Sequence, residues 1–127
     1  MPVRQSLLAR LRFDSRATQT LSAARGASEE AFTLNYSTEM HDIDIWEEPA
    51  EQGNWYLIGQ VLPLSGQETL QPQQVVFSAI DGAELSITPD MPEFHLPSIP
   101  AGIYNVTVRF PDSEILIPGF AVGKVAG

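Results

Sequence analysis

The feature that most constrains the fold is a two-residue alternation of apolar and polar side chains. In residues 103–110, every second position is apolar: Tyr104, Val106, Val108 and Phe110. Successive side chains of a β-strand point to opposite faces, so this period places all four on one face. Similar runs recur from residue 31 onward at intervals of roughly 8–12 residues, separated by glycine- and proline-rich turns. The pattern predicts an all-β sandwich of roughly seven or eight short antiparallel strands, forming a single domain over residues 31–127.

The clearest local signal is Asp81-Gly82, which separates two strand-like runs at residues 75–80 and 83–88. Asp-Gly between strands is typical of a type I′ hairpin, in which both turn residues have positive φ. The dipeptide therefore predicts a two-residue turn at this point.

Composition favours one globular domain. The chain has 127 residues, 43% of them hydrophobic, and no cysteine. The lack of cysteine excludes disulfide frameworks, thiolate metal sites and cysteine nucleophiles. No apolar run reaches the ~20 residues of a membrane helix, and Arg10 and Arg12 interrupt the early apolar run where a secretory signal needs an unbroken core. We therefore expect a cytoplasmic protein without a membrane partner.

The net charge of −9 is unevenly distributed, because five of the seven basic residues lie before residue 29. We expect residues 1–30 to form a basic extension, partly ordered as an arm or as a short helix over residues 16–25. It folds onto the acidic surface of the same domain, contacts an acidic partner, or is a transit peptide. The acidic body is expected to repel nucleic acid. The candidate contact residues of the arm are Arg4, Arg10, Arg12 and Arg16.

Residues 41–48 (HDIDIWEE) are the densest cluster of ionisable groups. Two aspartates on one strand face would lie roughly 6–7 Å apart, too far to share a compact ion. We therefore interpret the stretch as the solvated face of a strand. A divalent-ion site at His41, Asp42 and Asp44, or a catalytic pair, remains an alternative. Alternation assigns two sets to opposite faces: His41, Ile43, Ile45 and Glu47, against Asp42, Asp44, Trp46 and Glu48.

Two aromatic or titratable side chains are further candidates. An exposed Trp46 beside these acids would indicate a recognition patch. His95 is expected on a surface or edge strand. Signatures of a nucleophile elbow, a phosphate-binding loop and an EF-hand loop are absent from the sequence, so we expect neither enzymatic activity nor a cofactor.

Several motifs from Trp55 onward follow an order known from one family. They are Gly59-Gln60-Val61, the strand-like run 75–79, a short strand around Phe94, and Pro100-Ala101-Gly102-Ile103-Tyr104. In this order the chain resembles the carboxypeptidase regulatory-like domain, an immunoglobulin- or prealbumin-like (transthyretin-like) β-sandwich. Pro92-Glu93 stands where that family usually has glycine. The resemblance implies an accessory, non-catalytic module.

The segment before Trp55 is similar to what precedes such modules in some bacterial proteins linked to sigma-factor regulation. We therefore expect a module that binds another protein through the basic arm, an exposed sheet edge or the strand around Trp46. The alternative is a module that binds carbohydrate or another small ligand, with or without calcium at the acidic strand. The sequence leaves the oligomeric state open.

Overall fold

The structure is a computed structural model that describes residues 5–15, 31–64 and 71–123. No α-helix occurs in these ranges. The strands are β1 (Gln5–Leu8), β2 (Arg10–Asp14), β3 (Phe32–Ser37), β4 (His41–Pro49), β5 (Asn54–Pro63), β6 (Gln74–Ala79), β7 (Glu84–Ile87), β8 (Glu93–Pro100), β9 (Gly102–Arg109) and β10 (Ser113–Val122).

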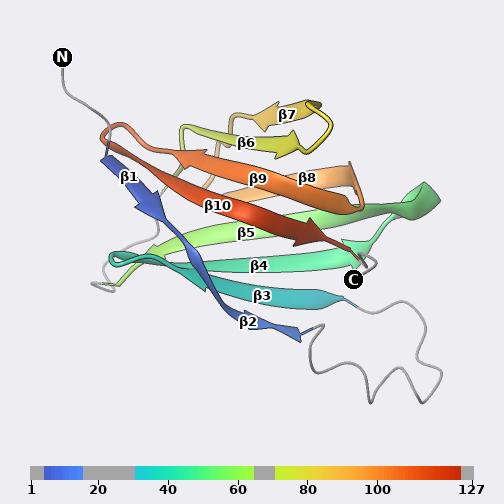
Figure 1. Cartoon of the computed structure of the whole chain (residues 1–127), viewed down its shortest axis with the longest axis horizontal. Coiled ribbons are helices and arrows are strands. Elements are labelled where there is room, and N and C mark those ends of the chain that lie inside the picture. The colour runs from blue at the N-terminus through green and yellow to red at the C-terminus, as the bar shows by residue number, and fades with distance from the viewer. Residues whose placement is uncertain (1–4, 16–30, 65–70, 124–127) are drawn as a thin grey trace.

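The strands form two five-stranded sheets that pack as the layers of a sandwich (Figure 1). Sheet A has the order β1-β10-β9-β6-β7, and sheet B has the order β2-β3-β4-β5-β8. Neighbouring strands are antiparallel except β1 and β10, which are parallel. The predicted all-β sandwich is confirmed. Eight strands, β3 to β10, lie after residue 30, and β1 and β2 add two more.

The chain passes from sheet A to sheet B between β1 and β2. Ala9 is buried at the crossing, and its N–H donates to the carbonyl of Leu116 over 2.9 Å. Arg10 then pairs with Ser37 of β3. Part of the predicted basic extension therefore supplies edge strands to both sheets, closing one side of the sandwich (Figure 1). Arg4, Arg16 and the predicted helix over residues 16–25 lie outside the described residues.

Aromatic side chains join the layers at the centre of a single hydrophobic core. Phe120 of sheet A contacts Tyr36 of sheet B, with ring centroids 5.8 Å apart. Phe77 lies edge-on to both Phe120 and Tyr104, at 5.8 and 5.9 Å. The Tyr104 hydroxyl donates to the carbonyl of Pro100 over 2.8 Å and so fixes the turn into β9. The apolar members of the alternating runs thus meet between the sheets.

The hairpin at Asp81-Gly82 is present, but its predicted turn type is wrong. Of the residues between β6 and β7, only Gly82 has a positive φ, of 100°. The Gly82 N–H donates to the carbonyl of Ala79, and the Ala79 N–H donates to the carbonyl of Ala83. The connection is therefore a three-residue loop that ends in a left-handed glycine. Asp81 stabilises this loop through its side chain and not through a positive φ, because its Oδ1 accepts the Ala83 N–H over 3.0 Å.

Gly59 in β5 provides the space that Phe94 of β8 needs. The two residues pair in sheet B, and both are buried. A Cβ at Gly59 would lie only 2.1 Å from the Phe94 ring. Neither the ring nor the paired backbone has room to move, since both belong to the closely packed core.

We expect Gly59→Ala to lower the free energy of unfolding by about 1–3 kcal/mol, the usual cost of overpacking a core. Urea denaturation followed by circular dichroism measures this change. Phe94→Leu should absorb part of the added volume, so the double variant should lose less stability than the sum of the single variants. An unchanged midpoint in Gly59→Ala would contradict the tight contact.

Candidate functional site

The acidic strand β4 separates its ionisable groups onto two faces. His41 is buried toward the core, whereas Asp42 is half-buried and Asp44 exposed on the outer face. The three candidate metal ligands are therefore not brought together. Across the described residues, no three His, Cys, Asp or Glu side chains form a group that could hold a metal ion.

The turn between β3 and β4 holds the imidazole of His41 in place. The Thr38 hydroxyl oxygen accepts the backbone N–H groups of Met40 and His41, each over 3.0 Å. Its own proton is thus available to the His41 Nδ1 atom at 3.0 Å. The imidazole also stacks on Phe110, with ring centroids 6.2 Å apart. Burial lowers the pKa of His41 below its usual value.

This lowered pKa predicts a pH-dependent stability. A histidine in the unfolded chain gains a proton near pH ~6.5, whereas folded His41 gains one only at a lower pH. The free energy of unfolding should therefore fall as the pH drops below the unfolded-state pKa toward the folded one. His41→Gln removes this titration while keeping a polar group beside Thr38.

Urea denaturation at pH 7.5 and 5.5 measures the effect. The wild type should lose more stability between these two values than His41→Gln, because His95 and the carboxylates are common to both proteins. Equal losses would contradict a neutral, buried His41.

Glu47 is the acid whose environment the sequence interpretation got wrong. Alternation correctly assigns it to the face of Ile43 and Ile45, but that face is the core and not the solvent. Glu47 is fully buried, and its Oε1 accepts the Gly123 N–H over 2.8 Å. That donor lies 76 residues away in the sequence, so no local pattern could have revealed it.

A groove crosses the outer face of sheet B, with a volume of about 420 Å³. Trp46, 41% exposed, lies in it beside Thr33 and Ile58, its neighbours on the adjacent strands. An exposed Trp46 beside the acids of β4 is the feature that we expect of a recognition patch, and Trp46 is exposed. The other outward-facing side chains that line the groove are Phe13, Asn35, Asp44, Gln60 and Glu93.

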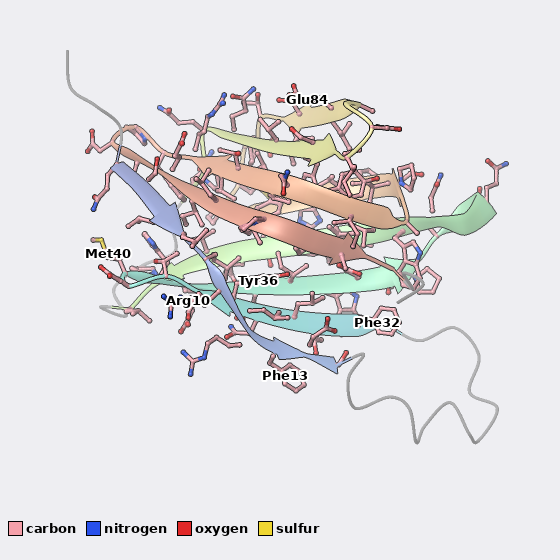
Figure 2. All side chains as sticks on the ribbon, viewed as in Figure 1. Arg10, Phe13, Phe32, Tyr36, Met40 and Glu84 are labelled. Carbon is pink, nitrogen blue, oxygen red and sulfur yellow. The ribbon has the colours of Figure 1, made fainter. Side chains whose placement is uncertain are left out.

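Phe13 reaches this groove because of a β-bulge in β2. Leu11 pairs with Tyr36, and Phe13 pairs with Asn35, so Arg12 is an extra residue between them. Tyr36 is buried toward the core, whereas Asn35 lies on the outer face of β3. The bulge therefore turns Phe13 outward, although simple alternation would put it on the same face as Leu11. Figure 2 shows Phe13 pointing away from the two layers.

A second hollow, of about 690 Å³, runs beside β1 and β2. Arg10 and Arg12 both line it and are both exposed. Within the described ranges neither forms an ion pair, and Arg12 makes a single long hydrogen bond, 3.4 Å, to the Ser37 hydroxyl. The structure thus brings together two of the four arginines proposed for the contact arm. The remaining lining residues are Gln5, Ser6, Leu7, Leu8, Ser37, Thr38 and Glu39.

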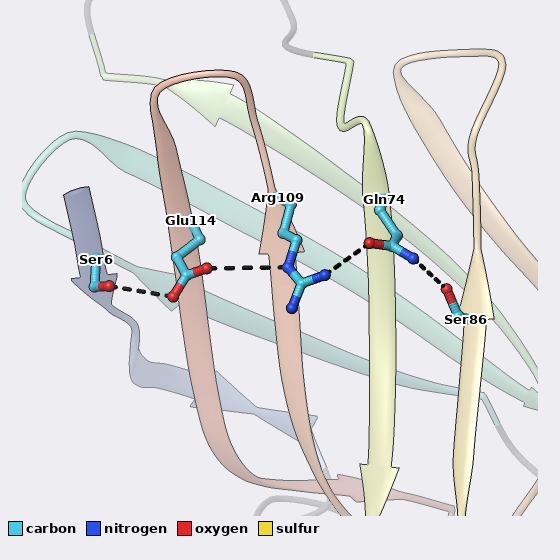
Figure 3. A network of polar contacts seen from close by, with 5 residues as sticks. All are labelled: Ser6, Gln74, Ser86, Arg109 and Glu114. Carbon is cyan, nitrogen blue, oxygen red and sulfur yellow. Dashed lines mark hydrogen bonds and ion pairs between the residues drawn. The ribbon is translucent and has the colours of Figure 1, made fainter. Parts of the chain in front are cut away.

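The outer face of sheet A carries a polar row whose members bind one another (Figure 3). Glu114 accepts the Ser6 hydroxyl over 3.2 Å and lies 4.0 Å from the Arg109 Nε atom. Arg109 Nη1 donates to Gln74 Oε1, and Gln74 Nε2 donates to the Ser86 hydroxyl, both over 2.8 Å. This row joins all five strands, and its Arg109 is already engaged within the protein.

His95 lies on the outer face of the edge strand β8, as the sequence predicts. Its Nδ1 atom is 2.8 Å from the Tyr56 hydroxyl, and its Nε2 atom is 4.0 Å from Glu93 Oε1. His41 faces the core on the opposite side of the same sheet. The two histidines therefore do not share a site.

No model of a known protein family, no curated protein and no solved structure matches this chain. Within the described ranges, no helix is long and apolar enough to cross a membrane.

Proposed function

We propose that this protein is a non-catalytic module that binds another protein at the edge formed by β1 and β2. The observation that carries the proposal is the hollow beside this edge, into which Arg10 and Arg12 project without an ion pair among the described residues. The partner contributes an acidic, extended segment. That segment adds to the sheet through main-chain hydrogen bonds, and its carboxylates meet the two guanidinium groups.

Charge supports this choice of partner. The chain carries a net charge of −9, so an acidic segment is repelled from most of its surface. Of the three described basic residues, Arg109 is engaged in the polar row of sheet A. Arg10 and Arg12 outnumber Glu39, the one acid that lines their hollow, and so define the one described region where a negative segment is attracted.

The other edges are less suited to strand addition. The edge strand β8 contains Pro97 and Pro100, which cannot donate main-chain hydrogen bonds. The edge strand β7 begins with Glu84, which repels an acidic segment. β2 has no proline, and its Leu11, 51% exposed, offers an apolar contact.

The family and cellular setting belong to the same proposal. Four motifs favour a carboxypeptidase regulatory-like domain. Two lie in the paired strands β5 and β8, the third lies in β6, and the fourth runs from the end of β8 into β9, which pairs with β6. A bacterial regulatory module linked to a sigma factor, working in the cytoplasm, agrees with the similarity of the segment before Trp55.

Charge removal at the edge tests the function. We expect the full-length variant Arg10→Ala/Arg12→Ala to recover its specific partners at least tenfold less than the wild type does. Quantitative affinity capture from the native cell extract at low ionic strength measures this recovery. The same interaction should weaken as salt is added, because screening acts on exposed charges.

The matched control is Gln71→Glu/Gln73→Glu, which also makes the net charge more negative by two but lies on exposed positions outside the edge. It should recover the partners as the wild type does. Equal recovery by the arginine variant would contradict the proposal. Removing the residues before position 29 is a poor substitute for the arginine variant, since it deletes both β1 and β2.

A further inference from the structure

We propose that the groove across the outer face of sheet B is a binding site for a neutral oligosaccharide. This site is separate from the β1–β2 edge and does not depend on the function proposed for that edge. Five side chains define it: Phe13, Asn35, Asp44, Gln60 and Glu93. They form one row, because Phe13 pairs with Asn35, Asn35 with Asp44, Asp44 with Gln60, and Gln60 with Glu93.

The row offers the hydrogen-bonding groups that sugar hydroxyls require. A hydroxyl both donates and accepts, and the row alternates amides, which do both, with carboxylates, which accept. Neighbouring members lie on adjacent strands, about 4.8 Å apart. Asn35 Nδ2 donates to Asp44 Oδ1 over 2.7 Å, which holds this carboxylate in position before any ligand binds. Gln60 and Glu93 have no side-chain hydrogen bond to each other, and Glu93 lies 4.0 Å from His95 Nε2, so both can still bond to a ligand.

Two aromatic rings provide the apolar surface for the C–H faces of sugar rings. Phe13 and Trp46 are 48% and 41% exposed and line the same groove. The negative face of an aromatic ring attracts weakly positive C–H groups. Phe13 and Trp46 lie on β2 and β4, which are two strand spacings, about 9.6 Å, apart. Trp46 also lies two residues along β4 from Asp44, the residue in the row of Phe13. The two aromatic rings can therefore contact different rings of one linear sugar chain.

Two neighbours favour one orientation of Trp46 before binding. Its Nε1 donates a long hydrogen bond, 3.4 Å, to Glu48 Oε2, and Ile58 is its paired residue on β5. A platform held in this way loses little conformational entropy when a ligand stacks on it.

Electrostatics select a neutral ligand. Asp44 and Glu93 line the groove, so an anionic sugar, a phosphate or a nucleic acid would meet two carboxylates. A cationic peptide side chain would pair with these same groups, but Asp44 already accepts a hydrogen bond from Asn35. The amide of Gln60 between the two acids also offers donors, which a cation cannot use. Uncharged hydroxyls use both kinds of group.

Titration of the ¹⁵N-labelled full-length protein tests this site. The probes are linear hexasaccharides of β-1,4-glucose, α-1,4-glucose, xylose, mannose and N-acetylglucosamine, together with an oligolysine peptide. We expect at least one hexasaccharide to shift the indole N–H signal of Trp46 at millimolar concentration or below. The indole signal of buried Trp55 should stay in place and serves as the internal reference.

Two variants separate this site from other surfaces. Trp46→Ala and Gln60→Leu should each weaken the hexasaccharide affinity at least tenfold, and both change outer-face side chains that the core does not need. Arg10→Ala/Arg12→Ala should bind the sugar as the wild type does. This variant therefore separates a failure of the partner-binding edge from a failure of the sugar site. The proposal is overturned if no hexasaccharide shifts the Trp46 signal, if Trp46→Ala binds unchanged, or if only oligolysine binds.

Discussion

The packing of the inner faces of the two sheets is the interaction on which the rest of the structure depends. Tyr36 of sheet B meets Phe120 of sheet A, and Phe77 packs edge-on against the latter. Burial of these apolar faces commits one side of each strand except β2 and β7 to the core. Any binding group must then lie on an outer face or at an open edge. The two proposed sites follow this division, one at the β1–β2 edge and one on the outer face of sheet B.

The β-bulge at Arg12 connects these two sites. The extra residue leaves Arg12 beside the hollow at the edge and turns Phe13 into the groove. A regular strand would have placed Phe13 on the inner side of β2 with Leu11. One irregularity of pairing therefore determines which side chains of β2 face each surface.

The two polar rows, one on the outer face of each sheet, differ in how many of their members bind one another. On sheet A, the row from Ser6 to Ser86 is joined by contacts within the protein, so its charged member Arg109 is already paired (Figure 3). On sheet B, the corresponding row contains one internal side-chain hydrogen bond among the described residues, between Asn35 and Asp44. Polar groups left without protein partners are the ones that can bind a ligand. This contrast favours sheet B as the ligand-binding face.

The sequence by itself determined the all-β sandwich, the number of strands after residue 30 and the alternating faces of β4, because side-chain period is a local property. Only the tertiary structure decided the partners of these faces. Glu47 is buried because Gly123 supplies its donor, and Phe13 lies in the groove because β3 pairs with a bulged strand. Contacts between distant segments depend on strand pairing and register, and no short stretch of sequence specifies either.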